Sequence, residues 1–206
     1  MELAETSTTD VYLFATLCDL FHNISKETPC GSLFLCYNIE MEYVFKKNLF
    51  PDINVSWEDV IIKTCEDNKT GQMRAVFDKQ HLPTFACHTK FRPGTLQTAF
   101  DYCNSKFEEE FPVMHVYYSF GDKVKTYGNH RDGVEVKLVQ AYGSMVYVLH
   151  NKIRIEMEKG DYLYVPKGVY HNPIVTGGPR INLSFSPFKG YFDGEEGNVQ
   201  MPVKQR

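Results

Sequence analysis

The apolar positions from residue 112 onward fall into short runs separated by turns rich in glycine. Each run is too short for a stable helix and is rich in the β-branched and aromatic residues that favour strands. The runs are 113–120, 135–141, 145–149, 153–157, 162–165 and 180–185. Many short strands with regular turn signals are typical of jelly-roll and barrel architectures. The fold class predicted from this pattern is mainly β, a sandwich or barrel.

The first 111 residues show a different, mixed pattern. Apolar residues at helical spacing predict helices at 11–21 and 95–110, and a capping signal at Ser56 predicts another at 57–65. Strands are predicted at 33–37 and 74–77. We therefore expect a mixed α/β region packing on the barrel (1–111), a barrel core (112–188) and a flexible tail (189–206).

Composition narrows the possible surroundings and partners. The 206 residues are 43% hydrophobic, enough for one sizeable core. Lys and Arg (22) nearly balance Asp and Glu (26), and the formal charge is -4. This balance does not favour electrostatic binding to nucleic acid or to an anionic membrane. The six cysteines lie in the first half without CxxC pairing, which favours reduced thiols. With no signal-like start and no apolar span, we expect a cytoplasmic protein.

A histidine and an aspartate two residues apart, His130 and Asp132, form the first candidate for chemistry. In an extended segment both side chains leave the same face and can converge on one ion. An isolated HxD pair is common by chance, so it needs a third ligand. His171 is the candidate, because it follows the predicted strand 162–165 and a turn at 166–168 that we expect to direct it out of regular strand pairing.

The proposed ligand set points to a particular class of metal. Two imidazoles and one carboxylate leave three positions of an octahedral ion open, which suits Fe(II) that must hold a bidentate cosubstrate and oxygen together. No thiolate lies near these positions in the sequence, which disfavours structural zinc. The spacing of 41 residues (171 minus 130) across a glycine-broken run of strands strengthens the prediction.

On these residues the sequence resembles the cupin-like double-stranded β-helix proteins, and within them the JmjC-type Fe(II)- and 2-oxoglutarate-dependent oxygenases. The carriers are His130-Arg131-Asp132, the runs 136–143 and 160–168, and His171. The resemblance implies iron at the three ligands, 2-oxoglutarate chelating beside it, and O2-dependent hydroxylation of a C–H bond coupled to decarboxylation of the cosubstrate. The Gly160-Asp161 turn and the 166–168 turn are scaffold features in many cupins.

The distal carboxylate of 2-oxoglutarate requires a cation, and a guanidinium can meet it with two parallel hydrogen bonds. Arg180, on the predicted strand 180–185, resembles the basic residue of the prolyl-hydroxylase branch, and Ser184 projects from the same face of that strand. JmjC-type enzymes usually carry a Lys or Arg where this chain has Met145. Either Arg180 takes over this work, or Lys137 reaches in from the earlier strand, or 2-oxoglutarate is not used.

Two phenols, Tyr117 and Tyr127, are further candidates for hydrogen bonds to the same carboxylate, although packing is the commoner role of a tyrosine on a barrel strand. His115 is more simply a core or edge histidine. His81 and His88 lie near Cys87, but no further ligand pair suggests a second metal site.

Three hypotheses about function remain open from the sequence. The first is an Fe(II)- and 2-oxoglutarate-dependent dioxygenase. The second is a metal-dependent cupin enzyme that does not use 2-oxoglutarate, which Met145 favours. The third is a cupin-fold binding module without turnover, against which the intact ligand set argues. The sequence does not identify the substrate, although a protein side chain or a small molecule is favoured over nucleic acid. The first 111 residues could line the mouth of the barrel or mediate a homodimer.

Overall fold

The computed structural model describes residues 43–71, 73–88 and 93–187. Contacts divide the chain into two units, Met1–Ile39 and Glu40–Arg206, and every described residue belongs to the second. The helix predicted at 11–21, the strand predicted at 33–37 and the tail predicted at 189–206 therefore lie outside the described residues. No helix in the described ranges is long and apolar enough to cross a membrane.

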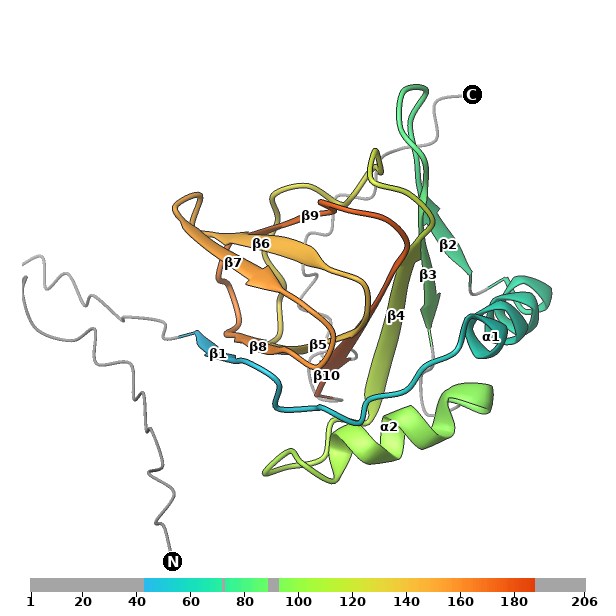
Figure 1. Cartoon of the computed structure of the whole chain (residues 1–206), viewed down its shortest axis with the longest axis horizontal. Helices are drawn as coiled ribbons and strands as arrows, with labels where there is room; N and C mark the ends of the chain where they lie inside the picture. Colours follow the sequence, from blue (N-terminus) through green and yellow to red (C-terminus); the bar gives the residue numbers. More distant parts are fainter. Residues whose placement is uncertain (1–42, 72, 89–92, 188–206) are drawn as a thin grey trace, which may run out of the picture. The chain divides into compact units, whose positions relative to one another are not determined.

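The described part is built mainly from antiparallel strands, with two helices and one short 3-10 turn (Figure 1). In chain order the elements are β1 Val44–Lys46, α1 Trp57–Lys69, β2 Arg74–Val76, β3 Thr84–His88, the 3-10 turn Gly94–Leu96, α2 Gln97–Asn104, β4 Val113–Ser119, β5 Val136–Tyr142, β6 Met145–Leu149, β7 Ile153–Met157, β8 Tyr162–Val165, β9 His171–Ile174 and β10 Arg180–Ser186.

Two sheets enclose the interior of the barrel. The larger has the order β1-β8-β5-β10-β4-β3-β2 and the smaller the order β7-β6-β9. Met145, Tyr147 and Leu149 of β6 cluster with Leu138 of β5 and Leu163 of β8, so the apolar side chains of the two sheets meet between them. This arrangement confirms the predicted mainly β, barrel-like fold class.

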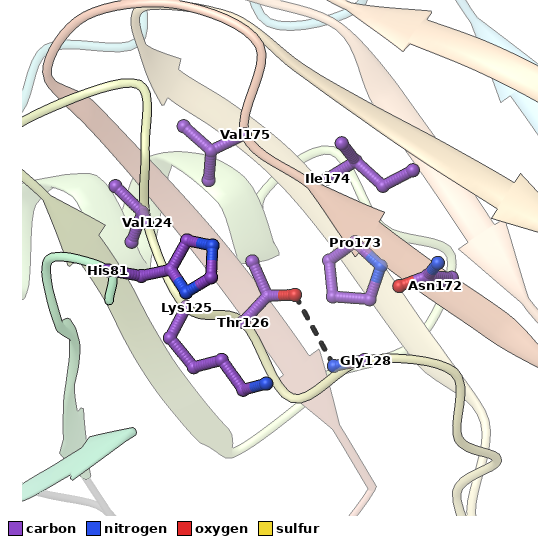
Figure 2. Close-up of a pocket in the computed structure, with 9 residues that line it drawn as sticks. All are labelled: His81, Val124, Lys125, Thr126, Gly128, Asn172, Pro173, Ile174 and Val175. Carbon is purple, nitrogen blue, oxygen red and sulfur yellow. Dashed lines mark hydrogen bonds between the residues drawn. The ribbon is translucent and has the colours of Figure 1, made fainter. Parts of the chain in front are cut away.

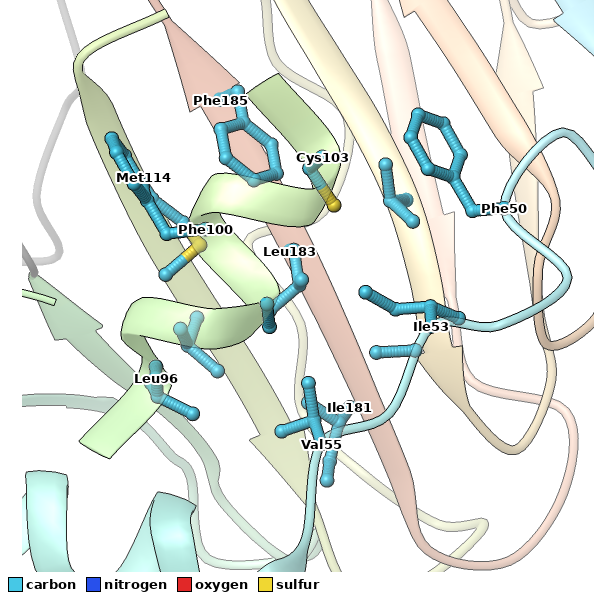
Figure 3. Close-up of a cluster of buried hydrophobic side chains, with 14 of the residues drawn as sticks. Phe50, Ile53, Val55, Leu96, Phe100, Cys103, Met114, Ile181, Leu183 and Phe185 are labelled. Atoms are coloured by element: carbon cyan, nitrogen blue, oxygen red, sulfur yellow. The ribbon is translucent and has the colours of Figure 1, made fainter. Parts of the chain in front are cut away.

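The other face of the large sheet packs against α2 and the segment before α1 (Figure 3). Ile181, Leu183 and Phe185 of β10 are fully buried on this face. The ring of Phe100 from α2 lies 6.1 Å from that of Phe185. Each large apolar side chain buried here contributes about 1.5–3 kcal/mol relative to an exposed one, so this layer is a major source of stability.

The two helices follow the sequence signals to different extents. The predicted capping box is confirmed at α1, where Ser56 Oγ accepts from the Asp59 N–H at 3.0 Å and the Ser56 N–H donates to Asp59 Oδ2 at 3.3 Å. The helix predicted at 95–110 ends earlier, at Asn104. The Asn104 side chain accepts from the Phe111 N–H at 2.8 Å, which holds the chain folded back after the helix.

The predicted barrel strands agree with the structure to within one residue at each end, but β1, β3 and β9 were not predicted. The prediction that His171 lies outside regular pairing is wrong, because it begins β9 and pairs with Leu149 of β6. Its strand escaped detection because β9 reads His-Asn-Pro-Ile, without an apolar run and with a proline inside.

The Gly160-Asp161 turn has the scaffold role predicted for it. The buried Asp161 carboxylate accepts from the N–H groups of Asn48 at 2.8 Å and Glu158 at 2.9 Å. Gly160 has φ of +92°, and a Cβ there would lie 2.8 Å from Asn48 Oδ1 and 3.2 Å from the Phe50 carbonyl oxygen. A glycine is thus required both by the backbone angle and by the close approach of the segment before α1.

Candidate metal centre

The two ligand-bearing segments are joined directly by a backbone bridge. The His130 N–H donates to the His171 carbonyl at 3.0 Å, and the His171 N–H donates to the His130 carbonyl at 2.8 Å. The Gly168 N–H donates to the Asp132 carbonyl at 3.0 Å, so the 166–168 turn holds the aspartate as well. Residues far apart in sequence are therefore fixed next to each other by main-chain bonds.

Both imidazoles are oriented in the same way. His130 Nδ1 lies 2.9 Å from the Gly128 carbonyl oxygen, and His171 Nδ1 lies 3.0 Å from the Val169 carbonyl oxygen. Since a carbonyl only accepts, each Nδ1 carries the proton, which leaves the Nε2 lone pair available. An outer hydrogen bond of this kind is the usual means of fixing a metal-binding histidine.

The three ligand atoms converge without bonding to one another. Asp132 lies 3.6 Å from His171 Nε2 through one carboxylate oxygen and 3.9 Å from His130 Nε2 through the other. The three heads lie within 4.8 Å of one another, and the two imidazole centroids are 4.3 Å apart. These distances are too long for hydrogen bonds. Ligands about 2.1 Å from a shared ion are at most about 4.2 Å apart, so small side-chain shifts suffice for coordination.

Burial keeps His171 in the form that binds metal. Its side chain is buried, and this burial lowers its pKa, while the Asp132 carboxylate raises it and His130 lowers it. A neutral imidazole keeps the lone pair that coordination requires. The donor set of two nitrogens and one carboxylate therefore fits a divalent transition metal.

Arg180 is the second unusual group inside the barrel. It is 2% exposed, and burial lowers the pKa of its guanidinium. Its contacts are neutral ones: one terminal nitrogen lies 3.4 Å from Thr84 Oγ1, the other lies 3.8 Å from Met145 Sδ, and Nε has no partner within the described part of the chain. A buried charge without a counter-ion is costly, so this position favours binding of an anion.

The contact with Met145 bears on the alternatives left open by the sequence. Met145 stands where JmjC-type enzymes usually carry a basic residue, and the guanidinium of Arg180 lies directly against its sulfur. The cation therefore reaches this part of the barrel from β10 rather than from β6.

Sequence reasoning missed the residues that link Arg180 to the metal ligands. The ring of Tyr147 lies 6.3 Å from that of His171, and its hydroxyl donates to Asn182 Oδ1 at 3.2 Å. Burial raises the pKa of Tyr147, Arg180 lowers it and Asp132 raises it, so this phenol lies within the field of both groups. The Asn182 amide in turn donates to Gln140 Oε1 at 3.0 Å. A polar residue at every second position of β10 was the available signal.

Tyr117 and Ser184 lie on the barrel-facing side of the large sheet, and Tyr127 lies in the segment before His130. The ring of Tyr127 is 6.0 Å from that of His130 and 5.8 Å from that of Tyr117. Tyr117 pairs with Asn182 across β4 and β10 and raises the pKa of Arg180. Ser184 pairs with His115 of β4, two interior positions beyond Arg180 along β10. The structure thus brings Tyr117 and Tyr127 toward the ligands, and Ser184 lies further away along the strand.

Lys137 is placed elsewhere. It pairs with Phe185 on the helix-facing side of the large sheet, and its Nζ lies 3.7 Å from the Phe111 ring centre and 4.7 Å from that of Phe107. Adjacent residues of a strand face opposite sides, so Leu138 faces the interior and Lys137 does not. The expectation that Lys137 reaches toward the cosubstrate does not fit this placement.

Known proteins resemble this chain in structure rather than in sequence. No protein-family description and no curated protein sequence matches the chain. The structure of YcfD, a ribosomal oxygenase from Escherichia coli, in complex with cobalt and 2-oxoglutarate is 15% identical, covers 70% of this chain and 47% of that chain, and has a TM-score of 0.52. The chain thus spans about half the length of that protein.

Two further solved structures are similar over parts of the chain. Another structure of E. coli YcfD is 16% identical, covers 70% of this chain and 47% of that one, and has a TM-score of 0.48. A Klebsiella pneumoniae protein with a double-stranded β-helix domain is 19% identical, covers 42% of this chain and 69% of that one, and has a TM-score of 0.33. At such identities the likeness to the cobalt complex concerns the fold alone. The described part of this chain has the double-stranded β-helix fold, the fold of the family that its sequence resembles.

Proposed function

We propose that this chain is an Fe(II)- and 2-oxoglutarate-dependent oxygenase that hydroxylates a substrate still to be identified. The observation that carries the proposal is the pair of groups inside one barrel: a convergent His130, Asp132 and His171 set, and a buried guanidinium that has no counter-ion among the described residues. Either group alone is compatible with a purely structural role. Together they match a metal that is chelated by one end of a dicarboxylate whose other end meets a cation.

Each residue has a defined share in this proposal. His130, Asp132 and His171 would hold Fe(II), which supplies the oxygen chemistry when bound. Arg180 would bind the distal carboxylate of 2-oxoglutarate through two of its N–H groups, with Tyr117 as a neighbouring phenol. Tyr147, whose hydroxyl donates to Asn182, would line the space beside the cosubstrate, since its ring lies 6.3 Å from that of His171 and Arg180 lowers its pKa. YcfD, a protein of similar fold, was solved in complex with cobalt and 2-oxoglutarate, which supports the choice of these two ligands.

The metal ligands are tested by direct binding of Co(II) to the full chain, measured by calorimetry and by metal content. We expect about one equivalent of metal for the native chain. The His171→Ala variant should lose at least about 100-fold in affinity, because one of three ligands is gone. The His150→Asn variant is the matched control, since His150 is exposed and has φ of +49°, an angle that asparagine tolerates. Equal affinity in both variants would contradict the assigned ligands.

Arg180 is tested with the Arg180→Met variant, which keeps an unbranched apolar stem and removes the charge. Affinity for 2-oxoglutarate in the presence of Fe(II) should fall by roughly 100-fold, because two charge-assisted hydrogen bonds are lost, while metal binding is retained. Stability without ligand should not decrease, since the variant removes a buried unpaired charge. Anaerobic titration followed by the visible charge-transfer band measures the affinity.

The exposed Arg154, which pairs with Glu156 at 3.1 Å, gives the control variant Arg154→Met. It should leave the affinity for 2-oxoglutarate unchanged. If Arg180→Met binds 2-oxoglutarate as well as the native chain does, the cosubstrate assignment fails and a metal-dependent cupin enzyme without 2-oxoglutarate becomes the better description.

A further inference from the structure

A pocket of about 270 Å³ opens beside the metal ligands, between the segment before His130 and the strand that His171 begins (Figure 2). One side is formed by residues just before His130, the other by β9 and the residue that follows it, and His81 closes it from the β2–β3 hairpin. The lining residues are His81, Val124, Lys125, Thr126, Gly128, Asn172, Pro173, Ile174 and Val175.

The pocket exists because the backbone ladder between the two segments stops after one pair. His130 and His171 bond to each other, and pairing continued by two residues would place Gly128 opposite Pro173. Proline has no N–H to donate, and the Gly128 carbonyl accepts from His130 Nδ1 instead. The Gly128 N–H donates to Thr126 Oγ1 at 3.3 Å. The interruption therefore has two consequences. It frees the Gly128 carbonyl to orient His130, and it leaves an opening in the barrel wall next to that histidine.

Two basic side chains, His81 and Lys125, form the polar rim of the pocket, and Asp78 holds both in place. Asp78 lies behind it, with one carboxylate oxygen 3.4 Å from Lys125 Nζ and the other 2.9 Å from His81 Nδ1. The N–H groups of Gln80 and His81 also donate to Asp78, at 2.8 and 2.9 Å. These bonds hold the pKa of the Asp78 carboxyl well below its usual range, so the group is a fixed anion that positions both basic side chains.

The remaining lining divides into donors and an apolar wall. Thr126 uses its hydroxyl oxygen to accept from Gly128, which leaves its O–H for a ligand, and Asn172 offers its side-chain amide. Val124, Ile174 and Val175 form the apolar part, and no carboxylate belongs to the lining that the described residues form. Basic and neutral donors above an apolar wall fit a carboxylate on a short aliphatic body, and the volume limits the occupant to a side chain or a small acid.

We propose that this pocket is a substrate-anchoring subsite of the metal centre and that the group it takes is a carboxylate, carried either by an acidic side chain of a peptide or by a small aliphatic acid. The role as an anchor rests on the proposed function, because the reacting part of the substrate would then lie at the neighbouring metal. The binding of a carboxylate by His81, Lys125 and Thr126 does not rest on it.

The experiment follows the methyl signals of Val124, Ile174 and Val175 by NMR in the full chain without metal. The small-acid probes are hexanoate and its neutral isostere hexanamide. The peptide probes are acetylated Ala-Glu-Ala amide and the same peptide with glutamine. We expect saturable shifts with hexanoate, with the glutamate peptide or with both, and binding at least about tenfold weaker for the matching neutral probe, since a charge-assisted hydrogen bond is lost. Which acid binds identifies the source of the carboxylate.

Two variants separate a specific site from general attraction to positive charge. Lys125→Gln should weaken binding by about fivefold or more. Lys123→Gln removes the same charge two residues away, from an exposed side chain outside the lining, and should bind as the native chain does. Equal binding of acid and amide, or equal effects of the two variants, would overturn the carboxylate subsite.

The position beside the metal is tested separately, with Mn(II) added to the native chain and to His171→Ala. The bound acid should show strong paramagnetic broadening with the native chain and little with the variant, whose methyl shifts should stay. A bound acid that Mn(II) does not broaden in a metal-loaded chain would refute the anchoring role. Failure of the native chain to bind any metal would refute the proposed function instead, while the methyl shifts still decide whether the pocket takes a carboxylate.

Discussion

The two faces of β10 carry opposite kinds of side chain. Ile181, Leu183 and Phe185 project toward the helices and join a fully apolar cluster. Arg180 and Asn182 project into the barrel, where they meet Met145 and Tyr147 of the small sheet. Both faces are equally buried, so burial alone does not explain the difference.

This difference shows how one strand serves stability and chemistry at the same time. On the helix-facing side, apolar burial stabilises the folded chain, and these side chains need no ligand. The interior side keeps polar groups in a low-dielectric space, where each must be satisfied by the chain or by a ligand. Asn182 is satisfied by Gln140 and Tyr147, whereas Arg180 has no anionic partner in the described ranges.

The largest effect is expected on the apolar face. Leu183→Ala should lower the free energy of unfolding by about 2–5 kcal/mol, because it leaves a cavity in a fully buried cluster. Ser184→Ala, the next residue and on the opposite face, should change it by less than about 1 kcal/mol. Urea unfolding of both variants measures the two values. A similar loss of unfolding free energy in both variants would show that the helix-facing side does not contribute more stability than the interior side.

A smaller effect on the same face depends on pH. Burial raises the pKa of Tyr118 from 10.0 to about 12, and a hydrogen bond with Thr64 at 2.7 Å lowers it. Because the folded state holds the proton more tightly than the unfolded state, the stability from this group is complete below pH 10 and is lost as pH rises through 12. The loss is on the order of 2 kcal/mol.

Tyr118→Phe should therefore flatten the fall in unfolding free energy between pH 9 and 12, at a cost of about 1 kcal/mol at pH 8 from the lost hydrogen bond. Tyr142→Phe, which removes the hydroxyl of an exposed side chain, is the control for the substitution itself. Burial also raises the pKa of Cys87, from 9.0 to about 11, so part of the alkaline loss should remain in Tyr118→Phe. Identical pH profiles for Tyr118→Phe and the native chain would contradict the assignment.

The smallest effect is expected for Lys137, a cation on the helix-facing side. Lys137→Met keeps the apolar stem against Phe107 and Phe111 and removes the ammonium group. Burial lowers the pKa of that ammonium group. We expect a change in unfolding free energy within about 1 kcal/mol and no change in the affinity for 2-oxoglutarate. Calorimetric titration beside Arg180→Met sharpens the comparison, since the two cations should differ by roughly 100-fold in their effect on that affinity. A large loss of affinity for 2-oxoglutarate in Lys137→Met would contradict the assignment of Arg180, rather than Lys137, as the cation that binds the cosubstrate.

The sequence predicted the strands best where apolar residues form runs. The runs at 145–149, 153–157 and 162–165 match β6, β7 and β8 at both ends, because each run places buried apolar side chains between residues that turn the chain, namely Gly143, His150 with Asn151, and Gly160. It failed at β9, which contains a proline and an asparagine and is stabilised by its neighbours on both sides. A strand whose pairing comes from elsewhere in the chain leaves little pattern of its own.

The sequence by itself determined which candidate groups are available for chemistry. His130, Asp132 and His171 were predicted from residue type and spacing, and Arg180 from its resemblance to the basic residue of the prolyl-hydroxylase branch. Only the tertiary structure decided what these groups meet. The carbonyl that orients each imidazole, the contact of Arg180 with Met145, the outward position of Lys137 and the pocket beside Pro173 all depend on register between distant segments. Register is set by hydrogen bonds that no single stretch of sequence encodes.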